Sequence, residues 1–260
     1  MKLSVVVVSL DGRVPPSVET AVRGNPHVEL ILVSGLCPVG RARNAGLARA
    51  RGDYVAWVDD DDEVTGDWLP SILSAIADPQ ADVVVFGHEW VVSETDRRTK
   101  IWRGRSLLAD LLAERGIQSM LWDKVVRRTL WQGVRFDDEA RSSEDWDVLP
   151  HVLLHARKVV SIDRVLYRYV RRMDSLANSV DMAVLQDIAQ RAEARMALCR
   201  QPAFAAYRRM IVQGVAQSMS ENPFGKGWLR RNFWRWASSG ASLRRQVKWT
   251  VRAFGWRCRP

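Results

Sequence analysis

One short segment constrains the fold more than any other. Residues 54–58 are apolar or aromatic, a glycine and an acid precede them, and four consecutive aspartates follow at residues 59–62. A short apolar run bounded in this way predicts a strand that is buried on both faces. The aspartates are then expected at the carboxyl end of that strand, where open α/β sheets bind their ligands.

The four aspartates need a compensating charge. Adjacent carboxylates repel one another unless a cation or solvent offsets them. Hard divalent cations prefer oxygen ligands and share their coordination with phosphate oxygens and water. The cluster therefore predicts a site for a metal and a phosphate. The alternative is an acidic loop that caps the next helix, since Asp62, Thr65 and Asp67 are all acceptable capping residues.

Strands and helices alternate through the first 90 residues. Apolar runs rich in β-branched residues predict strands at 3–8, 28–33, 54–58 and 82–86, and intervening patterns predict helices at 17–23, 39–50 and 67–77. This alternation predicts an α/β protein with a mostly parallel, doubly wound sheet.

The pattern is looser after residue 90. We expect a loop or hairpin at 91–103, a helix around 107–112, a further helix that includes 122–128, a helix at 144–155, a strand at 159–162, an edge strand or extended loop at 166–169, and two C-terminal helices between 181 and 220. The domain division predicted from these patterns is an α/β domain at 1–180, a helical extension at 181–221 and a basic, tryptophan-rich tail at 222–260.

The positive charge is concentrated in the tail. The chain has a net charge of +9, yet residues 222–260 hold ten lysines and arginines and no acid, so the rest of the chain is close to neutral. A near-neutral body argues against a nucleic-acid groove in the main domain. The three cysteines are far apart and lack metal-type spacing, and no apolar run is long enough to span a membrane. We therefore expect free thiols in a reducing, cytoplasmic setting.

Five segments in order resemble the motifs of the family 2 glycosyltransferases, which have the nucleotide-sugar-binding GT-A fold. Residues 4–8 resemble the opening strand, 42–46 the Ala-Arg-Asn-x-Gly helix start, 59–62 the Asp-x-Asp-Asp motif, 122–128 the Trp-Asn-Lys-Leu-x-Arg-Arg segment, and 144–145 the Glu-Asp motif, which is followed by 166–169 and by Arg171, Arg172 and Ser175. Each piece alone is weak, but five in order with plausible spacing are specific. The resemblance covers about residues 1–180.

The chain departs from the family pattern at two places. Its first strand ends Val-Ser-Leu-Asp where the family has Pro-Val-Tyr-Asn, and Ser34-Gly35 follows the second strand where the family has Asp-Asp-Gly-Ser. Only residues 34–41 separate this strand from the Ala-Arg-Asn helix, so the helix and strand that usually intervene are missing. We therefore expect a shortened base pocket that discriminates weakly among nucleotide bases.

The resemblance implies roles for the acids of the cluster. Asp61 matches the second aspartate of Asp-x-Asp and is the expected ligand of Mn²⁺ or Mg²⁺. Asp59 is expected to contact the ribose or a metal-bound water, and Asp62 to lie near the metal or sugar. Asp60 is the least suited of the four, because a continuing strand would point it to the opposite face.

The Glu-Asp motif implies the catalytic base. Asp145 matches the family's base, which takes a proton from the acceptor hydroxyl during an inverting displacement. The alternative is simple capping, because acids are favoured in the first turn of any helix. Glu144 and Trp146 are candidates for the acceptor site, where the indole would stack on a sugar face, although core packing suits the tryptophan equally well.

Four arginines are candidates for donor binding. Arg41 and Arg43 are expected to reach the diphosphate or sugar, or else to lie on a solvated helix face with their neighbours. Arg171 and Arg172 are expected to close over the diphosphate. Lys124 either pairs with an acid or contacts the acceptor.

The tail has the composition of an amphipathic helix. Leu243, Val247, Val251 and Phe254 fall on one helical stripe that arginines and lysines flank. This pattern favours an interfacial helix on an anionic membrane. A helix packed on the body is the second interpretation, and single-stranded nucleic acid, which we do not expect, is the third.

Together these observations predict a metal-dependent, inverting glycosyltransferase. Its expected donor is a nucleotide sugar, most of all a UDP-sugar, and its acceptor is a glycan or a lipid-linked acceptor in cell-surface polysaccharide synthesis. We expect a cytoplasmic protein held peripherally at the inner face of the cell membrane. The alternatives are a nucleotidyltransferase, for which residues 11–15 form a poor phosphate loop, and a degenerate transferase that serves as a binding module.

Overall fold

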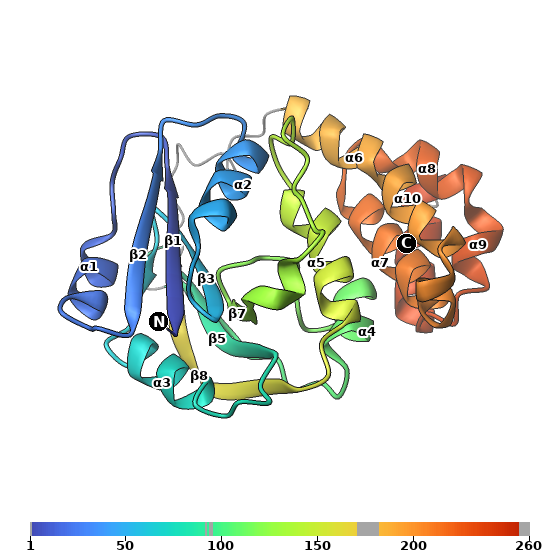
Figure 1. Cartoon of the computed structure of the whole chain (residues 1–260). Helices are drawn as coiled ribbons and strands as arrows, with labels where there is room; N and C mark the ends of the chain where they lie inside the picture. The colour runs from blue at the N-terminus through green and yellow to red at the C-terminus, as the bar shows by residue number, and fades with distance from the viewer. Residues whose placement is uncertain (1, 92, 94–95, 171–181, 255–260) are drawn as a thin grey trace. The chain divides into compact units, whose positions relative to one another are not determined.

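The computed structural model describes residues 2–91, 93, 96–170 and 182–254, and the chain forms two compact units (Figure 1). The first unit comprises residues 1–105 and 119–179 and contains the sheet. The second comprises residues 106–118 and 180–260 and is helical in its described part. The expected boundary near residue 180 falls within 171–181, a stretch outside the described residues.

A single mixed sheet forms the first unit. Its strands are β1 (Leu3–Ser9), β2 (Val28–Ser34), β3 (Tyr54–Asp59), β4 (Glu63–Val64), β5 (Val83–Val91), β6 (Arg97–Lys100), β7 (Lys124–Arg127) and β8 (Val159–Val170). They are ordered β2-β1-β3-β7-β5-β8-β4, with β6 paired to β5. Strands β1, β2, β3, β5 and β8 run in one direction, and β4, β6 and β7 run in the other. The predicted α/β fold with a mostly parallel sheet is therefore confirmed.

The two faces of the sheet follow the alternation of side chains along each strand. Helices of this unit are α1 (Pro16–Val22), α2 (Val39–Arg49), α3 (Trp68–Ala75) and α5 (Glu144–Leu154). Tyr54, Ala56 and Val58 join the core that includes residues of α1 and α3. Trp57 lies on the opposite face with α2, where a Cβ on Gly46 would come within 2.5 Å of Val6 Cγ1. Glycine at this position lets α2 approach the sheet closely.

Two expectations about the later segments were wrong. Residues 124–127, expected in a helix, form β7, which pairs antiparallel with β3 and β5. Val125 and Val126 are β-branched, and the two neighbouring strands bury them completely, so tertiary pairing decides their conformation. The strands expected at 159–162 and 166–169 are one strand, β8, and Tyr167 pairs with β5 on one side and with β4 on the other. This part of β8 is therefore not an edge.

The second unit contains α4 (Leu107–Leu112), α6 (Met182–Ala197), α7 (Arg208–Glu221), α8 (Gly225–Arg231), α9 (Phe233–Ala237) and α10 (Leu243–Phe254). Both helices expected between 181 and 220 are present as α6 and α7. Trp228, Trp236 and Trp249 of the tail are buried, and α10 packs on α7 and α8. Across the described residues, no helix has both the length and the apolar character needed to cross a membrane.

Candidate active site

The acidic cluster follows β3 at its carboxyl end, as expected. Asp59 lies on the same face as Trp57, which is the face that α2 covers. Asp60 points to the opposite face, where its carboxylate accepts a hydrogen bond of 2.5 Å from Ser9 Oγ at the end of β1. Asp61 is half-buried, and Asp62 is buried. The end of β3 at Asp59 and the turn that follows it therefore place the four carboxylates in different environments.

Arg43 is the buried cation of the site. Only 6% of the residue is exposed, its Nη2 donates to Asp59 Oδ1 at 2.8 Å, and its Nε lies 3.4 Å from Glu144 Oε1. The guanidinium carbon is 5.1 Å from the Trp57 ring centroid, a cation–π contact. Nη1 has no hydrogen-bond partner among the described residues. The interpretation of Arg43 as part of a solvated helix face is therefore wrong.

The base candidate stands in the first turn of α5. Ser143, just before the helix, has φ 57° and ψ 20°, a left-handed conformation that is uncommon outside glycine and asparagine. Glu144 is buried against Arg43, whereas Asp145 is half-buried and accepts a hydrogen bond of 3.5 Å from Ser119 Oγ. Asp145 is thus partly accessible, as a group that exchanges protons with a substrate must be.

The environment of Asp145 opposes its ionisation. Burial and the Glu144 charge raise the pKa of Asp145 to about 8, although Arg43 and Lys124 act to lower it. A carboxylate with a raised pKa binds a proton more strongly, which suits a general base working near neutral pH. Simple helix capping does not require such a shift.

Asp62 links the acidic cluster to β8 through hydrogen bonds. Its Oδ2 accepts a hydrogen bond of 2.7 Å from the Tyr167 hydroxyl, and its Oδ1 accepts one of 2.9 Å from the Val170 N–H. The Tyr167 oxygen in turn accepts from the Asp59 N–H at 3.2 Å. Burial and the Asp59 charge raise the pKa of Asp62 to about 8. Both oxygens of Asp62 are therefore bonded within the protein.

Lys124 lies in β7 and is completely buried. Its ammonium pairs with Asp123 and donates to the Met120 carbonyl at 2.7 Å. Asp123 Oδ2 lies 3.3 Å from His88 Nδ1. Burial raises the pKa of Asp123, but Lys124 and His88 more than offset this, so the pKa lies below its usual value. Of the two alternatives for Lys124, the structure shows the ion pair.

The remaining candidates differ in their surroundings. Arg41 is exposed and pairs with the exposed Glu139 at 2.9 Å. Trp146 is buried in α5, which supports its interpretation as core packing. Arg171 and Arg172 lie outside the described residues. Asn44 ties α2 to the segment before α5, because its amide donates to the Phe136 carbonyl at 2.9 Å and accepts from the Phe136 N–H at 3.0 Å.

Sequence reasoning did not single out Ser9, Tyr167 or Ser119 as individual site residues. Tyr167 belongs to the Leu-Tyr-Arg-Tyr segment of the family pattern, so that motif was the available signal. Ser9 and Ser119 carry no signal in the sequence, because their positions beside Asp60 and Asp145 depend on contacts between distant segments.

The acidic side chains at the end of β3 fit a hard divalent cation that a diphosphate helps to coordinate. Asp59 and Asp61 both act to raise the pKa of Asp62, which shows that the carboxylates are close enough to repel one another. In the part of the chain that the structure describes, no group of three or more acidic, histidine or cysteine side chains forms a complete metal site. Mg²⁺ is often held by one or two carboxylates together with substrate phosphates and water.

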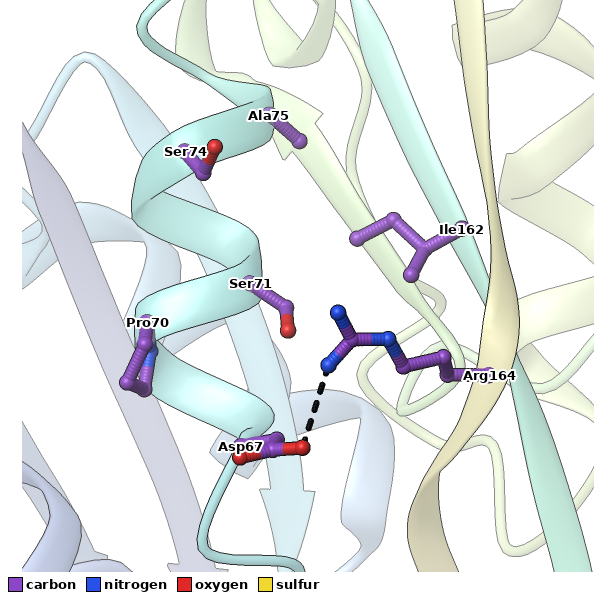
Figure 2. A pocket seen from close by; sticks show the side chains of 7 residues that line it. All are labelled: Asp67, Pro70, Ser71, Ser74, Ala75, Ile162 and Arg164. Atoms are coloured by element: carbon purple, nitrogen blue, oxygen red, sulfur yellow. Dashed lines mark hydrogen bonds and ion pairs between the residues drawn. The ribbon is translucent and has the colours of Figure 1, made fainter.

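A separate cavity of about 380 Å³ lies between α3 and β8 (Figure 2). Arg164 reaches across it from β8 and pairs with Asp67 at 3.1 Å, and Ser71 and Ser74 line the helical side. None of the residues that line this cavity is one of the candidates above, and both members of its ion pair are exposed. The chemistry of the acidic cluster is therefore located elsewhere.

The mixed sheet and the acidic cluster at the carboxyl end of β3 define an α/β architecture with a candidate ligand site at one edge of the sheet. The family model described as glycosyl transferase family 2 matches residues 9–139, half of the chain. The chain therefore belongs to glycosyl transferase family 2. It is 28% identical over 151 residues to the glycosyltransferase GlyA of Streptococcus pneumoniae, a match that covers 52% of this chain and 21% of GlyA. It is 26% identical over 166 residues to GlyG of the same species, covering 58% of this chain and 54% of GlyG.

Solved structures show the same fold. S. aureus TarS 1–349 in complex with UDP-GlcNAc superposes with a TM-score of 0.63 at 17% identity, covering 97% of this chain and 79% of that one. The mannosyltransferase PcManGT of Pyrobaculum calidifontis, in complex with GDP-Man and Mn²⁺, gives 0.51 at 12% identity, covering 94% and 77%. The expected GT-A fold is confirmed by these similarities.

Proposed function

We propose that the protein is a glycosyltransferase that moves a sugar from a nucleotide-sugar donor to a hydroxyl group in polysaccharide synthesis. The observation that carries this proposal is that Arg43 joins the acidic end of β3 to the first turn of α5, which bears a half-buried carboxylate of raised pKa. A donor-binding edge and a base on one scaffold are what glycosyl transfer requires.

The proposed reaction has one proton acceptor. Asp145 accepts the proton of the acceptor hydroxyl, whose oxygen bonds to the anomeric carbon while the bond to the donor diphosphate breaks. Displacement from the opposite side inverts the anomeric centre. Arg43, through its unpartnered Nη1, and Arg41 with Arg171 and Arg172 supply positive charge for the diphosphate.

A divalent cation, Mn²⁺ or Mg²⁺, fits this proposal as the partner of the diphosphate. Asp61 is its proposed ligand, with Asp59 near it, and the cation would supply charge neutralisation for the leaving group. The structure of PcManGT is a complex with GDP-Man and Mn²⁺, which supports the use of a divalent cation. Asp62 holds the adjacent loop to β8 through Tyr167 and Val170.

We propose a UDP-sugar as the donor, since TarS was crystallised with UDP-GlcNAc. The segments that the family resemblance assigns to binding of the nucleotide base are short or exposed in this chain. Leu10 after β1 is 60% exposed, and Asp11 pairs with Arg13 at the surface. A short connection leads from β2 directly to α2, without the helix and strand expected in the family. We therefore retain the prediction of weak discrimination among bases.

The decisive experiment follows the donor. The purified protein, incubated with a panel of nucleotide sugars and Mn²⁺, is expected to release nucleoside diphosphate from one of them and to lose this activity with EDTA. Release of pyrophosphate from a nucleoside triphosphate and a sugar phosphate would indicate a nucleotidyltransferase. Binding of donor without any turnover, in the presence of glycan acceptors, would indicate a degenerate binding module.

We also propose that the second unit contacts an anionic membrane, where it would meet a lipid-linked acceptor at the inner face. The surface that supports this proposal is an aromatic cluster of Phe233, Trp234 and Phe254. Trp234 is 80% exposed, and the Phe233 ring lies 5.0 Å from Trp234 and 5.5 Å from Phe254. Exposed Arg231 and Arg235 flank it in sequence. The side chains of Leu243, Val247 and Val251, on which the expected stripe depends, lie outside the described residues.

The full chain tests this proposal better than a truncation, because residues 222–254 contribute buried tryptophans to the helical core. Full-length protein should co-sediment with vesicles that contain phosphatidylglycerol and not with pure phosphatidylcholine. The double variant Arg231→Gln/Arg235→Gln should bind these anionic vesicles about fivefold more weakly for each charge removed, and its vesicle binding should depend less on salt. Leu30→Ala, a change to an exposed side chain of the first unit, serves as the control. Equal binding to both vesicles would contradict the proposal.

A further inference from the structure

The Arg43 guanidinium connects two acids that the sequence separates widely. Asp59 is 16 residues from Arg43, and Glu144 is 101 residues from it. Both acids lie within 3.4 Å of guanidinium nitrogens, and the side chains of Arg43 and Glu144 are only 7% and 8% exposed. A buried ion pair of this kind is costly unless its geometry is well satisfied, and removing one partner leaves an uncompensated charge.

Glu144 has little access to a substrate. Its carboxylate is buried against Arg43, and Ser143 before it holds a left-handed backbone conformation. The helix α5 begins directly after Ser143, and in its first turn Glu144 is buried while the next residue, Asp145, is half-buried. Sequence reasoning placed Glu144 at the acceptor site, but its contacts indicate a different task.

We propose that Arg43 and Glu144 are positioning residues for the base, and that their ion pair fixes the first turn of α5 against the donor end of β3. This inference rests on the proposed function, since it presupposes that Asp145 is the base. The same guanidinium holds Asp59, so the donor-binding edge and the base are tied to one side chain. Loss of the pair should therefore affect both the ionisation of Asp145 and the binding of donor.

The pair also sets the charge around Asp145. Three charged side chains act on its carboxylate from different elements: Glu144 on α5 itself, Arg43 on α2 and Lys124 on β7. Glu144 disfavours ionisation, whereas Arg43 and Lys124 favour it. The two members of the pair therefore shift the pKa of Asp145 in opposite directions, as their opposite charges require.

The experiment uses this difference in sign. The carboxyl carbons of aspartate-labelled protein are titrated by NMR without donor, and the Asp145 signal is assigned by its loss in Asp145→Asn. Glu144→Gln should lower the titration midpoint of Asp145 by about one pH unit, because a negative neighbour is removed. Arg43→Gln should raise it by a similar amount. Arg49→Gln, on the same helix but exposed and bonded to the Leu32 carbonyl, should leave it unchanged.

Kinetics and calorimetry complete the test. The low-pH limb of kcat/KM should move with the NMR midpoint in each variant. Arg43→Lys keeps the charge but cannot reproduce the planar guanidinium that bonds Asp59 and Glu144 through separate nitrogens. This variant should leave the titration midpoint of Asp145 near that of the wild type and weaken donor binding about tenfold. It also serves as the second variant where Arg43→Gln fails to fold.

Midpoints that move in the same direction in Glu144→Gln and Arg43→Gln, or that do not move, would overturn the inference even if the protein transfers sugar. A wild type without any transferase activity would refute the proposed function, while the NMR titration would still decide the role of the pair.

Discussion

The acidic end of β3 and the basic tail are the two most charged regions of this chain, and they use charge in opposite ways. In the first unit four charged side chains lie inside: Arg43, Asp62, Lys124 and Glu144 are buried and bonded to other side chains or to the backbone. In the second unit most arginines and lysines of residues 222–254 lie at the surface, and tryptophans fill the interior.

This difference has a physical reason. Burial of a charge costs free energy, so an unpaired one is rarely tolerated, and a set of buried, paired charges indicates a functional requirement. Burial of an indole is favourable and needs no such explanation. The aspartate run and the tryptophan-rich tail were equally conspicuous in the sequence, yet we propose chemistry only for the first. The second mainly provides a core.

The largest expected effect separates two tryptophans of the tail. Trp236 is buried, and its Nε1 donates to the Leu229 carbonyl at 2.7 Å. Trp236→Ala should destabilise the protein by about 3–5 kcal/mol, the usual cost of emptying such a site. Trp234→Ala, at an 80% exposed position, should change stability by less than about 0.5 kcal/mol. Chemical denaturation measures both, and similar losses would contradict the described packing.

The next effect concerns turnover. Asp145→Asn keeps the shape of the side chain and removes its capacity to accept a proton, so kcat should fall by about 10²-fold or more while donor affinity stays near normal. In the wild type, kcat/KM should decline as pH falls below about 8, because Asp145 becomes protonated there. If activity survives in this variant but is lost in Asp147→Asn, the base has been assigned to the wrong carboxylate.

A smaller effect is expected on binding. Asp61→Asn should remove most of the Mn²⁺-dependent part of nucleotide affinity, about tenfold or more, without unfolding the protein, because the side chain is only half-buried. Calorimetry with and without metal measures this part. Asp60→Asn is the matched control, since Asp60 points to the other face and bonds Ser9. An equal loss in both variants would argue against Asp61 as the ligand.

The smallest expected effect is on base selectivity. Because the base region is short, nucleoside diphosphates should compete for the site with affinities that differ by about tenfold or less. Competition binding with UDP, GDP, ADP and CDP tests this, with the ribose and diphosphate held constant. A strong and exclusive preference for uridine would show that other residues read the base.

The sequence by itself determined the order of seven of the first eight elements, all except the two-residue strand β4, and the place of the acidic cluster. A run such as residues 54–58 can bury itself only as a strand between other strands, and the aspartates after it must then lie at its end. Glycine at position 46 and the alternation along β3 and β1 are local properties too, and they assign each residue to a face. Such features depend on a few neighbouring residues, so they can be read from the chain directly.

The tertiary structure decided what depends on distant partners. Residues 124–127 became a strand because β3 and β5 offered hydrogen bonds on both sides, which no local pattern reveals. Which acid is buried and which is paired depends on Arg43 and Tyr167, which lie far away in sequence from Glu144 and Asp62, and the raised pKa of Asp145 follows from its burial and the Glu144 charge. Electrostatic interactions and burial depend on distances in space, and those distances exist only once the chain has folded.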